Sequence, residues 1–403
     1  MCSSDLFGYA DSKMAVSDMI TGIVLALAGI GSYKTNRKIF FLLAALLGIW
    51  LQLSPLFFWA KEAAAYTNAT FTGIIVILLA FQVHSMTGEE LDEVDEIPPG
   101  WSFNPSAWKP RVVTVGLALV SWFLARYLTA YQLGYIDQIH DPFTGEGTIK
   151  VITSSVARFF PVPDAGLGAF GYTLDFLLGI IGSSRRWRTM PWLSVFFGLM
   201  VVPAGFISVV LIILQPLLVG AWCGICLTIA SCMLVMILLT LPEMAAVIQL
   251  LSWVRKTNRD FWGIFWNGIS KVELSKYPGK VMTAKRRRGF SELGFTCPWN
   301  LVLSILIGGW LMLSPGVLGI NQPAADVDYI VGPLLITFSI ISMSEVTRHL
   351  RFANIALGFT LLVTPVWAEG FSFIGAVNDV FFGVLVMVLS LRKGLILEHC
   401  GKK

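Results

Sequence analysis

Long apolar blocks dominate the chain, and short polar segments separate them. Most blocks approach the length of about 20 residues that a helix needs to cross a hydrocarbon core of about 30 Å. Helices are expected in these blocks because lipid offers no hydrogen-bond partner to an open strand. The predicted spans, about eleven in all, are 17–33, 39–58, 70–84, 112–133, 167–182, 191–214, 222–242, 299–318, 329–343, 352–367 and 376–391.

Composition supports a membrane protein. Hydrophobic residues make up 56% of the chain and charged residues 13%, whereas soluble domains average about 25% charged residues. So little charge cannot coat a water-facing surface. We therefore predict an all-α integral membrane protein. Asp5, Asp11 and Lys13 interrupt the N-terminus before the first apolar run, so no cleavable signal peptide is expected.

Lys and Arg concentrate in alternate loops. One loop holds Lys34, Arg37 and Lys38, another Arg185, Arg186 and Arg188, and residues 252–298 include the run Lys285–Arg288. The positive-inside rule then places the N-terminus outside and the C-terminus in the cytoplasm. The acidic stretch Glu89–Glu96 does not oppose this, because the rule counts Lys and Arg. A basic loop beside membrane lipid explains Lys285–Arg288 better than nucleic-acid binding does, and no nucleic-acid partner is expected.

The two ends of the chain repeat one another. Residues Trp50–Pro55 (WLQLSP) recur as Trp310–Pro315 (WLMLSP), and Thr364-Pro365 is a weaker third copy. A glycine follows each proline after 17 or 18 residues, at Gly73, Gly332 and Gly383. These features predict helical hairpins with a Ser-Pro break near one end and close packing at the glycine.

The repeats resemble the SPW repeat of bacterial membrane proteins. Asp18 and Gly22 match the second half of a repeat with no first half before it, which suggests that the N-terminus as given is truncated or degenerate. We expect five regions: SPW-like repeats at 1–86, a linker at 87–107, a four-helix domain at 108–245, a basic cytoplasmic loop at 246–298, and two SPW-like repeats at 299–403.

A CxxC pair opens the seventh predicted span, at Cys223 and Cys226. Two cysteines at this spacing can form a disulfide near the first turn of a helix, where the helix dipole favours the thiolate. Cysteines are also common small hydrophobes in apolar helices, so the spacing alone leaves redox and structural roles open. A metal site is not expected, because zinc prefers four ligands and His140 lies in a long loop.

Residues 108–242 resemble the vitamin K epoxide reductase family, a four-helix bundle that encloses a quinone beside a CxxC. The matching segments are Trp108–Arg111, Lys150–Ser155, Gly168–Leu174 and Trp222–Cys226. The resemblance implies a quinone cofactor such as menaquinone or ubiquinone. It also implies an external thiol partner, either a thioredoxin-like protein or a small thiol.

The resemblance suggests residue roles. Cys226, deeper on the helix, would face the quinone, and Cys223, nearer the surface, would exchange with incoming thiols. Asp164 matches a position that hydrogen-bonds a quinone oxygen, but a helix cap explains it equally well. Ser154, Tyr172 and Trp222 complete the quinone site that the resemblance suggests. An ordinary turn would explain a serine at position 154 equally well.

One departure from the family concerns the first outer loop, which normally carries a second cysteine pair that relays electrons. Residues 134–166 contain no cysteine, and Thr148 stands where one is expected, with His140 near the other position. Cys232 falls on the opposite helix face. Cys297 and Cys400 are expected inside, and Cys2 lies on an unanchored terminus. An external reductant would therefore have to reach Cys223 directly.

Two charged residues lie within the predicted spans of this domain, Arg126 in the first and Asp175 in the second. Intramembrane charges usually face a bundle interior and pair, so we predict an Arg126–Asp175 ion pair beneath the quinone.

These observations favour a quinone-linked thiol–disulfide oxidoreductase in a prokaryotic plasma membrane. The alternative is a membrane scaffold that keeps the fold without turnover, because the loop cysteines are absent. A transporter is less favoured, since no span shows the paired broken helices typical of a substrate site.

Overall fold

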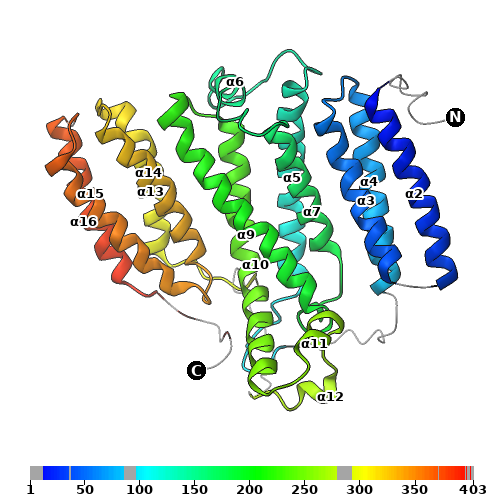
Figure 1. Ribbon diagram of the computed structural model, residues 1–403. Helices are drawn as coiled ribbons and strands as arrows, with labels where there is room; N and C mark the ends of the chain where they lie inside the picture. Colours follow the sequence, from blue (N-terminus) through cyan, green and yellow to red (C-terminus); the bar gives the residue numbers. More distant parts are fainter. Residues whose placement is uncertain are drawn as a thin grey trace. The chain divides into compact units, whose positions relative to one another are not determined.

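The computed structural model describes residues 12–35, 38–85, 97–278, 293–370, 372–394, 396 and 400 (Figure 1). Cys2, Glu89–Glu96 and Lys285–Arg288 lie outside these residues. The regular structure in the described part is helical, with two isolated β-bridges, Trp101–Cys400 and Phe295–Ser344. The all-α prediction is therefore confirmed.

Ten helices in the described part are long and apolar enough to cross a membrane. They are α2 (Lys13–Thr35), α3 (Lys38–Phe57), α4 (Ala63–Ser85), α5 (Trp108–Gln132), α9 (Pro191–Leu214) with η1 (Gln215–Val219), α10 (Gly224–Lys256), α13 (Trp299–Leu318), α14 (Ala324–Ile341), α15 (Ala353–Trp367) with η3 (Arg348–Phe352), and α16 (Phe373–Leu391). The remaining predicted span forms α7 (Asp164–Ile180), which has 17 residues.

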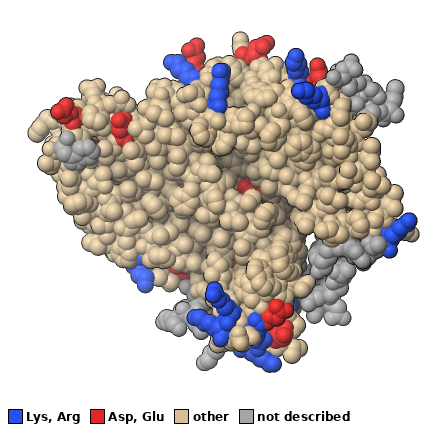
Figure 2. All heavy atoms as spheres, viewed as in Figure 1, with Lys and Arg blue, Asp and Glu red and all other residues tan. Residues whose placement is uncertain are grey.

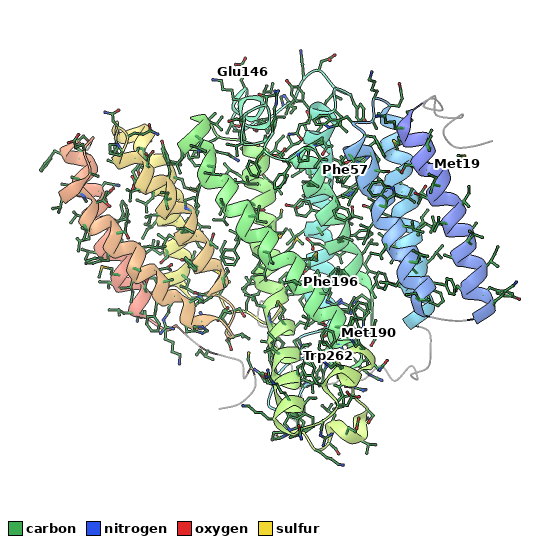
Figure 3. All side chains as sticks on the ribbon, in the orientation of Figure 1. Met19, Phe57, Glu146, Met190, Phe196 and Trp262 are labelled. Carbon is green, nitrogen blue, oxygen red and sulfur yellow. The ribbon has the colours of Figure 1, made fainter. Side chains whose placement is uncertain are left out.

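The surfaces of these helices match their composition. On the face shown in Figure 2, charged side chains gather near the helix ends, and the helix sides are largely free of them. Large apolar side chains such as Met19 and Phe196 are exposed there instead (Figure 3). Helices with an apolar surface of this kind fit a bilayer better than water.

The described chain divides into two compact units: Met1–Glu93, Ala118–Ile181 and Cys223–Ile225 in the first, and Val94–Leu117, Gly182–Trp222 and Cys226–Lys403 in the second. In the first, α7 packs against α3 and α4. In the second, α9 packs against α14. The predicted boundaries at 108 and 245, and the four-helix bundle between them, stay predictions.

Helix α10 is longer than predicted. The expected span ended at residue 242, but the helix continues through Pro242 to Lys256. Its extension packs Val247, Leu250 and Val254 against the short helices α11 (Phe261–Asn267) and α12 (Lys271–Leu274). The apolar periodicity that continues after Pro242 could have predicted this extension of the helix. Much of the segment predicted as a basic loop is therefore folded.

The SPW-like hairpins have the predicted glycine crossings. A Cβ atom added to Gly73 would lie 2.6 Å from the carbonyl oxygen of Gly48, and the same close approach joins α13 to α14 and α15 to α16. The crossing pairs are Gly48 with Gly73, Gly308 with Gly332, and Gly358 with Gly383.

Candidate functional site

The CxxC pair lies at the start of α10. Cys223 precedes the helix, which begins at Gly224, and Cys226 lies in its first turn. Both cysteines are disulfide-bonded, as the spacing allowed. Cys223 has no exposed surface, whereas Cys226 is partly exposed. The prediction that Cys223 is the surface sulfur is therefore wrong for this conformation.

A hydrogen-bonded loop, residues 133–146 between α5 and the short helix α6 (Gly147–Ile152), contacts the residue next to Cys223 at the start of α10. The Gly224 N–H donates to the Asp141 carboxylate at 3.0 Å and to the Thr144 hydroxyl at 3.0 Å. The N–H groups of a first helical turn have no partner within the helix, so an acceptor from outside satisfies one of them. A carboxylate is the strongest acceptor available and is favoured by the helix dipole.

Gly224 fits this closed loop because it has no side chain. A Cβ atom at this position would lie 2.8 Å from Asp141 Oδ1 and 2.8 Å from Phe143 Cβ. Both distances are shorter than a carbon atom tolerates. Position 224, the first of the two residues between the cysteines, therefore requires glycine.

Asp141 is the centre of the loop's own hydrogen bonds. Its carboxylate accepts the Phe143 N–H at 2.8 Å and the Thr144 hydroxyl at 2.6 Å, and it also accepts the Thr148 hydroxyl. Burial alone would raise the pKa of Asp141, but these hydrogen bonds outweigh it and lower the pKa to about 2. The carboxylate is thus charged at every physiological pH.

Thr148 occupies the position where the family resemblance predicts a relay cysteine. It lies on the short helix α6 (Gly147–Ile152) and is fully buried. Its hydroxyl donates to Asp141, which in turn holds Gly224. Sequence reasoning missed Asp141 itself, although an Asp-Pro pair is a typical turn signal.

Asp164 and Ser154 are occupied by local hydrogen bonds. Asp164 is the first residue of α7, and its Oδ1 accepts Gln132 Nε2 at 2.5 Å and the Ala165 N–H at 2.8 Å. Ser154 donates to the Val151 carbonyl at 2.7 Å. Asp164 is not the cap of α7, since the N-cap position is Pro163. A quinone contact from Asp164 or Ser154 stays a prediction. Gln132, which sequence reasoning missed, also donates to the Ile152 carbonyl and so joins α5 to α6 and α7.

The predicted Arg126–Asp175 ion pair does not form. The Arg126 guanidinium instead donates to Thr70 Oγ1 at 2.7 Å and stacks over the Tyr66 ring at 3.9 Å. Asp175 is buried on α7, and its Oδ1 has no partner among the described residues. The prediction was wrong because the Arg126 face of α5 points to α4, so hydroxyl and ring partners from the N-terminal repeat satisfy the cation.

Tyr172 and Trp222, the other predicted quinone contacts, lie in different surroundings. Tyr172 is buried on α7. Trp222 packs edge-on against Tyr329 of α14, with ring centroids 5.8 Å apart. The C-terminal repeat therefore supports the residue that immediately precedes the CxxC.

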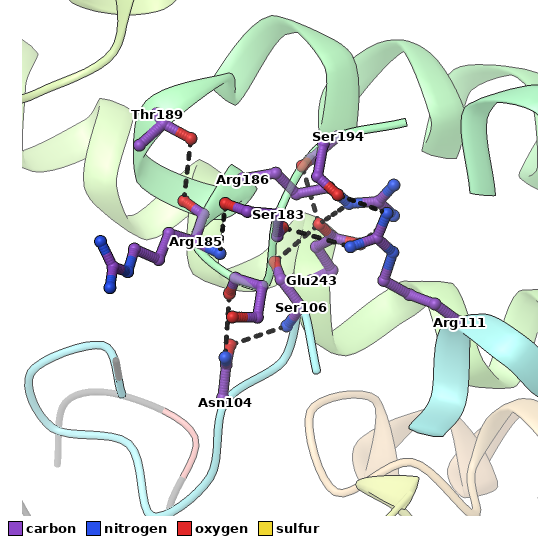
Figure 4. A network of polar contacts seen from close by, with 11 residues as sticks. Asn104, Ser106, Arg111, Ser183, Arg185, Arg186, Thr189, Ser194 and Glu243 are labelled. Atoms are coloured by element: carbon purple, nitrogen blue, oxygen red, sulfur yellow. Dashed lines mark hydrogen bonds and ion pairs between the residues drawn. The ribbon is translucent and has the colours of Figure 1, made fainter. Parts of the chain in front are cut away.

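A second buried polar network lies in the second unit, around Glu243 of α10 (Figure 4). Arg186 binds Glu243 through two contacts of 2.6 Å each, and Ser106 and Ser194 donate to the same carboxylate at 2.7 and 2.9 Å. Arg111 donates to the Gly182 carbonyl at 2.9 Å. A buried bidentate pair with its remaining positions filled holds these segments together, so we assign this network a structural role.

No group of three His, Cys, Asp or Glu residues in the described part is placed to hold a metal ion. The chemistry that the site offers is thiol–disulfide exchange at Cys223 and Cys226, beside the Asp141 carboxylate, which accepts hydrogen bonds from the loop and from Gly224.

Comparison with known families agrees with these features. Residues 112–241 match the vitamin K epoxide reductase family, and residues 1–82 and 298–393 match the SPW repeat domain. No curated protein and no solved structure matches the chain. The chain is thus a multi-pass membrane protein that carries a vitamin K epoxide reductase family domain flanked on both sides by SPW repeats.

Proposed function

We propose that this protein is a quinone-linked thiol–disulfide oxidoreductase. The observation that carries the proposal is a disulfide-bonded CxxC at the N-terminus of α10, within a vitamin K epoxide reductase family domain. An external dithiol would be oxidised to a disulfide while the Cys223–Cys226 disulfide is reduced to two thiols. Exchange passes through a mixed disulfide with the attacking thiol.

A bound quinone would accept the two electrons and two protons that return Cys223 and Cys226 to the disulfide. The residues present support such a cofactor on α7. Asp175 Oδ1 is a buried polar atom without a partner among the described residues, which points to a polar group that the protein itself does not supply. Tyr172 lies three residues earlier, on the same side of the helix. We therefore assign the polar contacts of the quinone to Tyr172 and Asp175 ahead of Asp164 and Ser154.

The closed loop sets the condition for thiol access. Cys223 has no exposed surface, so an incoming thiol reaches it after the loop releases Gly224. The hydrogen bonds from the Gly224 N–H to Asp141 and to Thr144 are the contacts that must break. Asp141 is thus a positioning residue of the proposed reaction.

The distribution of Lys and Arg supports a location in a prokaryotic plasma membrane with the N-terminus outside. The CxxC then faces the oxidising side, where disulfides persist. The thiol donor would be a thioredoxin-like protein or a small thiol on that side.

Anaerobic titration of the purified protein tests the proposal. We expect the reduced Cys223–Cys226 pair to be reoxidised by menaquinone or ubiquinone in a two-electron step, as followed by mass-tagging of thiols. The variant Cys226→Ala should accumulate a reducible adduct with an added thioredoxin-like protein, and Cys223→Ala should not.

The scaffold alternative predicts the opposite results. It is favoured by the absence of cysteines from residues 134–166. If no quinone reoxidises the wild-type thiols and Cys226→Ala traps no thiol, the protein is a scaffold that keeps the fold.

A further inference from the structure

Two aspartates occupy the same position in the two C-terminal SPW repeats. Asp328 of α14 and Asp379 of α16 each lie four residues before the crossing glycine of their hairpin, Gly332 and Gly383. The two hairpins pack on each other, α13 against α16 and α14 against α15 (Figure 1). Both carboxyl groups are fully buried, and they are close enough to interact electrostatically. The packing of the repeats therefore brings two acidic groups together inside the protein.

Uncharged side chains hold one oxygen of each carboxyl group. Ser314 Oγ of α13 donates to Asp328 Oδ2 at 3.1 Å. Asn378 Nδ2 donates to Asp379 Oδ1 at 3.1 Å, and Asn378 Oδ1 accepts the indole N–H of Trp310 at 2.9 Å. The other two oxygens, Asp328 Oδ1 and Asp379 Oδ2, are buried and have no partner among the described residues. Buried polar atoms normally have a partner, so these two atoms point to a ligand that the protein itself does not supply.

No cation on the surrounding helices balances the pair. Helices α13 to α16 contain no Lys, Arg or His, and neither do α9 and η1, which pack against α14. The titratable residues of the elements packed around the pair are Asp326, Tyr329, Arg348, His349 and Arg351. The last three belong to η3, which follows the opposite end of α14, and the helix from Asp328 to Ile341 covers about 20 Å.

A proton fits this site better than a metal ion does. An ionised carboxylate in an apolar interior is so unfavourable that the group takes up a proton instead, and a second carboxylate beside it adds repulsion. A calcium ion takes about six to eight oxygen ligands, but no third His, Cys, Asp or Glu joins the pair in the described part of the chain. A proton needs neither a cavity nor further ligands.

The N-terminal hairpin shows that the repeat folds without this acid. Helices α3 and α4 have the same glycine crossing, between Gly48 and Gly73. The position four residues before Gly73 is Ala69, which is buried. A buried aspartate is therefore not required to build the hairpin, and its cost in the C-terminal repeats calls for another role.

We propose that Asp328 and Asp379 form a proton-binding site, and that the pair holds at least one proton at neutral pH on the oxygens that the chain leaves without a partner. The proton comes from water and is bound without any change in oxidation state. The proposal is independent of the redox function.

Infrared spectroscopy of the full chain tests the site, because the C=O stretch of a protonated carboxyl group is separate from the bands of a carboxylate. The protein is studied in a detergent without ester groups. At pH 7 an aspartate in water is protonated in about one molecule in a thousand, whereas this pair should contribute at least one protonated group per chain. The double variant Asp328→Asn/Asp379→Asn should lose this contribution. The controls Asp137→Asn, at an exposed position, and Asp175→Asn should keep it.

The pH dependence of stability gives a second measurement. A carboxyl group that keeps its proton in the folded chain loses it more readily in the unfolded chain, so stability falls as pH rises. Above about pH 4, the unfolding equilibrium constant of the wild type should rise relative to that of the double variant, by up to about tenfold per pH unit for each proton retained.

A conservative variant covers the case in which the double variant does not fold. Asp379→Glu keeps a carboxyl group, so it should shift the protonated-carboxyl band instead of removing it. A wild type without this band at pH 7 would overturn the proposal, and so would a band that none of these replacements at the pair alters. A band that sodium ions remove would also overturn it, because the pair would then bind a metal cation.

Discussion

The Gly224 N–H, within the CxxC motif, donates to the carboxylate of Asp141, in the loop between α5 and α6, at 3.0 Å. This contact ties the loop to the residue that directly follows Cys223. The same N–H also donates to the Thr144 hydroxyl at 3.0 Å, so two acceptors of one loop hold the start of α10.

Removing the Asp141 carboxylate should speed reduction of the disulfide. Hydrogen bonds to charged groups contribute about 1.5–3 kcal/mol, so Asp141→Ala should raise the rate of reduction by dithiothreitol by roughly ten- to a hundredfold. The rate is measured by mass-tagging of thiols in the purified protein. Asp137→Ala, at an exposed position of the same loop, should leave the rate unchanged. An unaltered rate in Asp141→Ala would mean that the loop does not limit access.

A thiol at position 148 should be captured by the CxxC. Thr148 and Gly224 are both bonded to Asp141, so this side chain lies beside the site. In a Cys226→Ala background, Thr148→Cys should form an internal disulfide with Cys223, identified by mass spectrometry of cleaved peptides. Thr153→Cys, exposed at the end of α6, is the control and should form little. Absence of the 148–223 disulfide under oxidising conditions would contradict the closed loop.

The pH dependence of loop closure follows from Asp141. Its pKa is lowered to about 2 in the folded protein, against about 3.9 in an unfolded chain. A lowered pKa gives stability that is fully present above about pH 3.9 and is lost as pH falls through about 2. We therefore measure the rate at which a phosphine reduces the Cys223–Cys226 disulfide, divided by its rate with a small reference disulfide. This ratio should be constant between pH 4 and pH 8 and should rise below about pH 3. Acceleration already at pH 6 would show that another group controls the loop.

Arg126 and Asp175 should behave as independent residues. Arg126→Leu removes the bond to Thr70 and the contact with Tyr66, and should lower the free energy of unfolding in detergent by about 1–2 kcal/mol. Asp175→Asn should leave stability nearly unchanged but weaken quinone binding, measured by fluorescence quenching. In a double-mutant cycle, a coupling energy above about 0.5 kcal/mol between Arg126 and Asp175 would show that the two residues interact and would contradict their independence.

Sequence alone predicted the features that depend on local composition and spacing. Apolar length predicted the spanning helices, and the recurring Ser-Pro and glycine positions predicted the hairpins and their crossings at Gly73, Gly332 and Gly383. The CxxC spacing allowed a disulfide at a helix start, and the family resemblance predicted one. Each of these depends on residues that are near one another in the chain or follow a fixed period.

Features that depend on which way a side chain faces were not predictable. Arg126 was expected to face α7, but helical periodicity does not say which neighbour a face meets, and α4 provides its partners. The Gly224 N–H, next to Cys223, donates to Asp141, which is 83 residues earlier in the sequence. No local pattern links an Asp-Pro turn to a distant glycine, so this contact required the structure.

The bond from Arg126 to Thr70 has a consequence for how the chain can be divided. The family match begins at residue 112, yet the cation in the first helix of that domain is satisfied by a helix that precedes it. The Tyr135 hydroxyl likewise donates to the Ala60 carbonyl, and Leu56 packs against Gly166. A chain shortened to residues 108–245 would lack Thr70 and Tyr66, the partners of this guanidinium. A piece cut at the borders of the family match would therefore lose contacts that hold its own side chains.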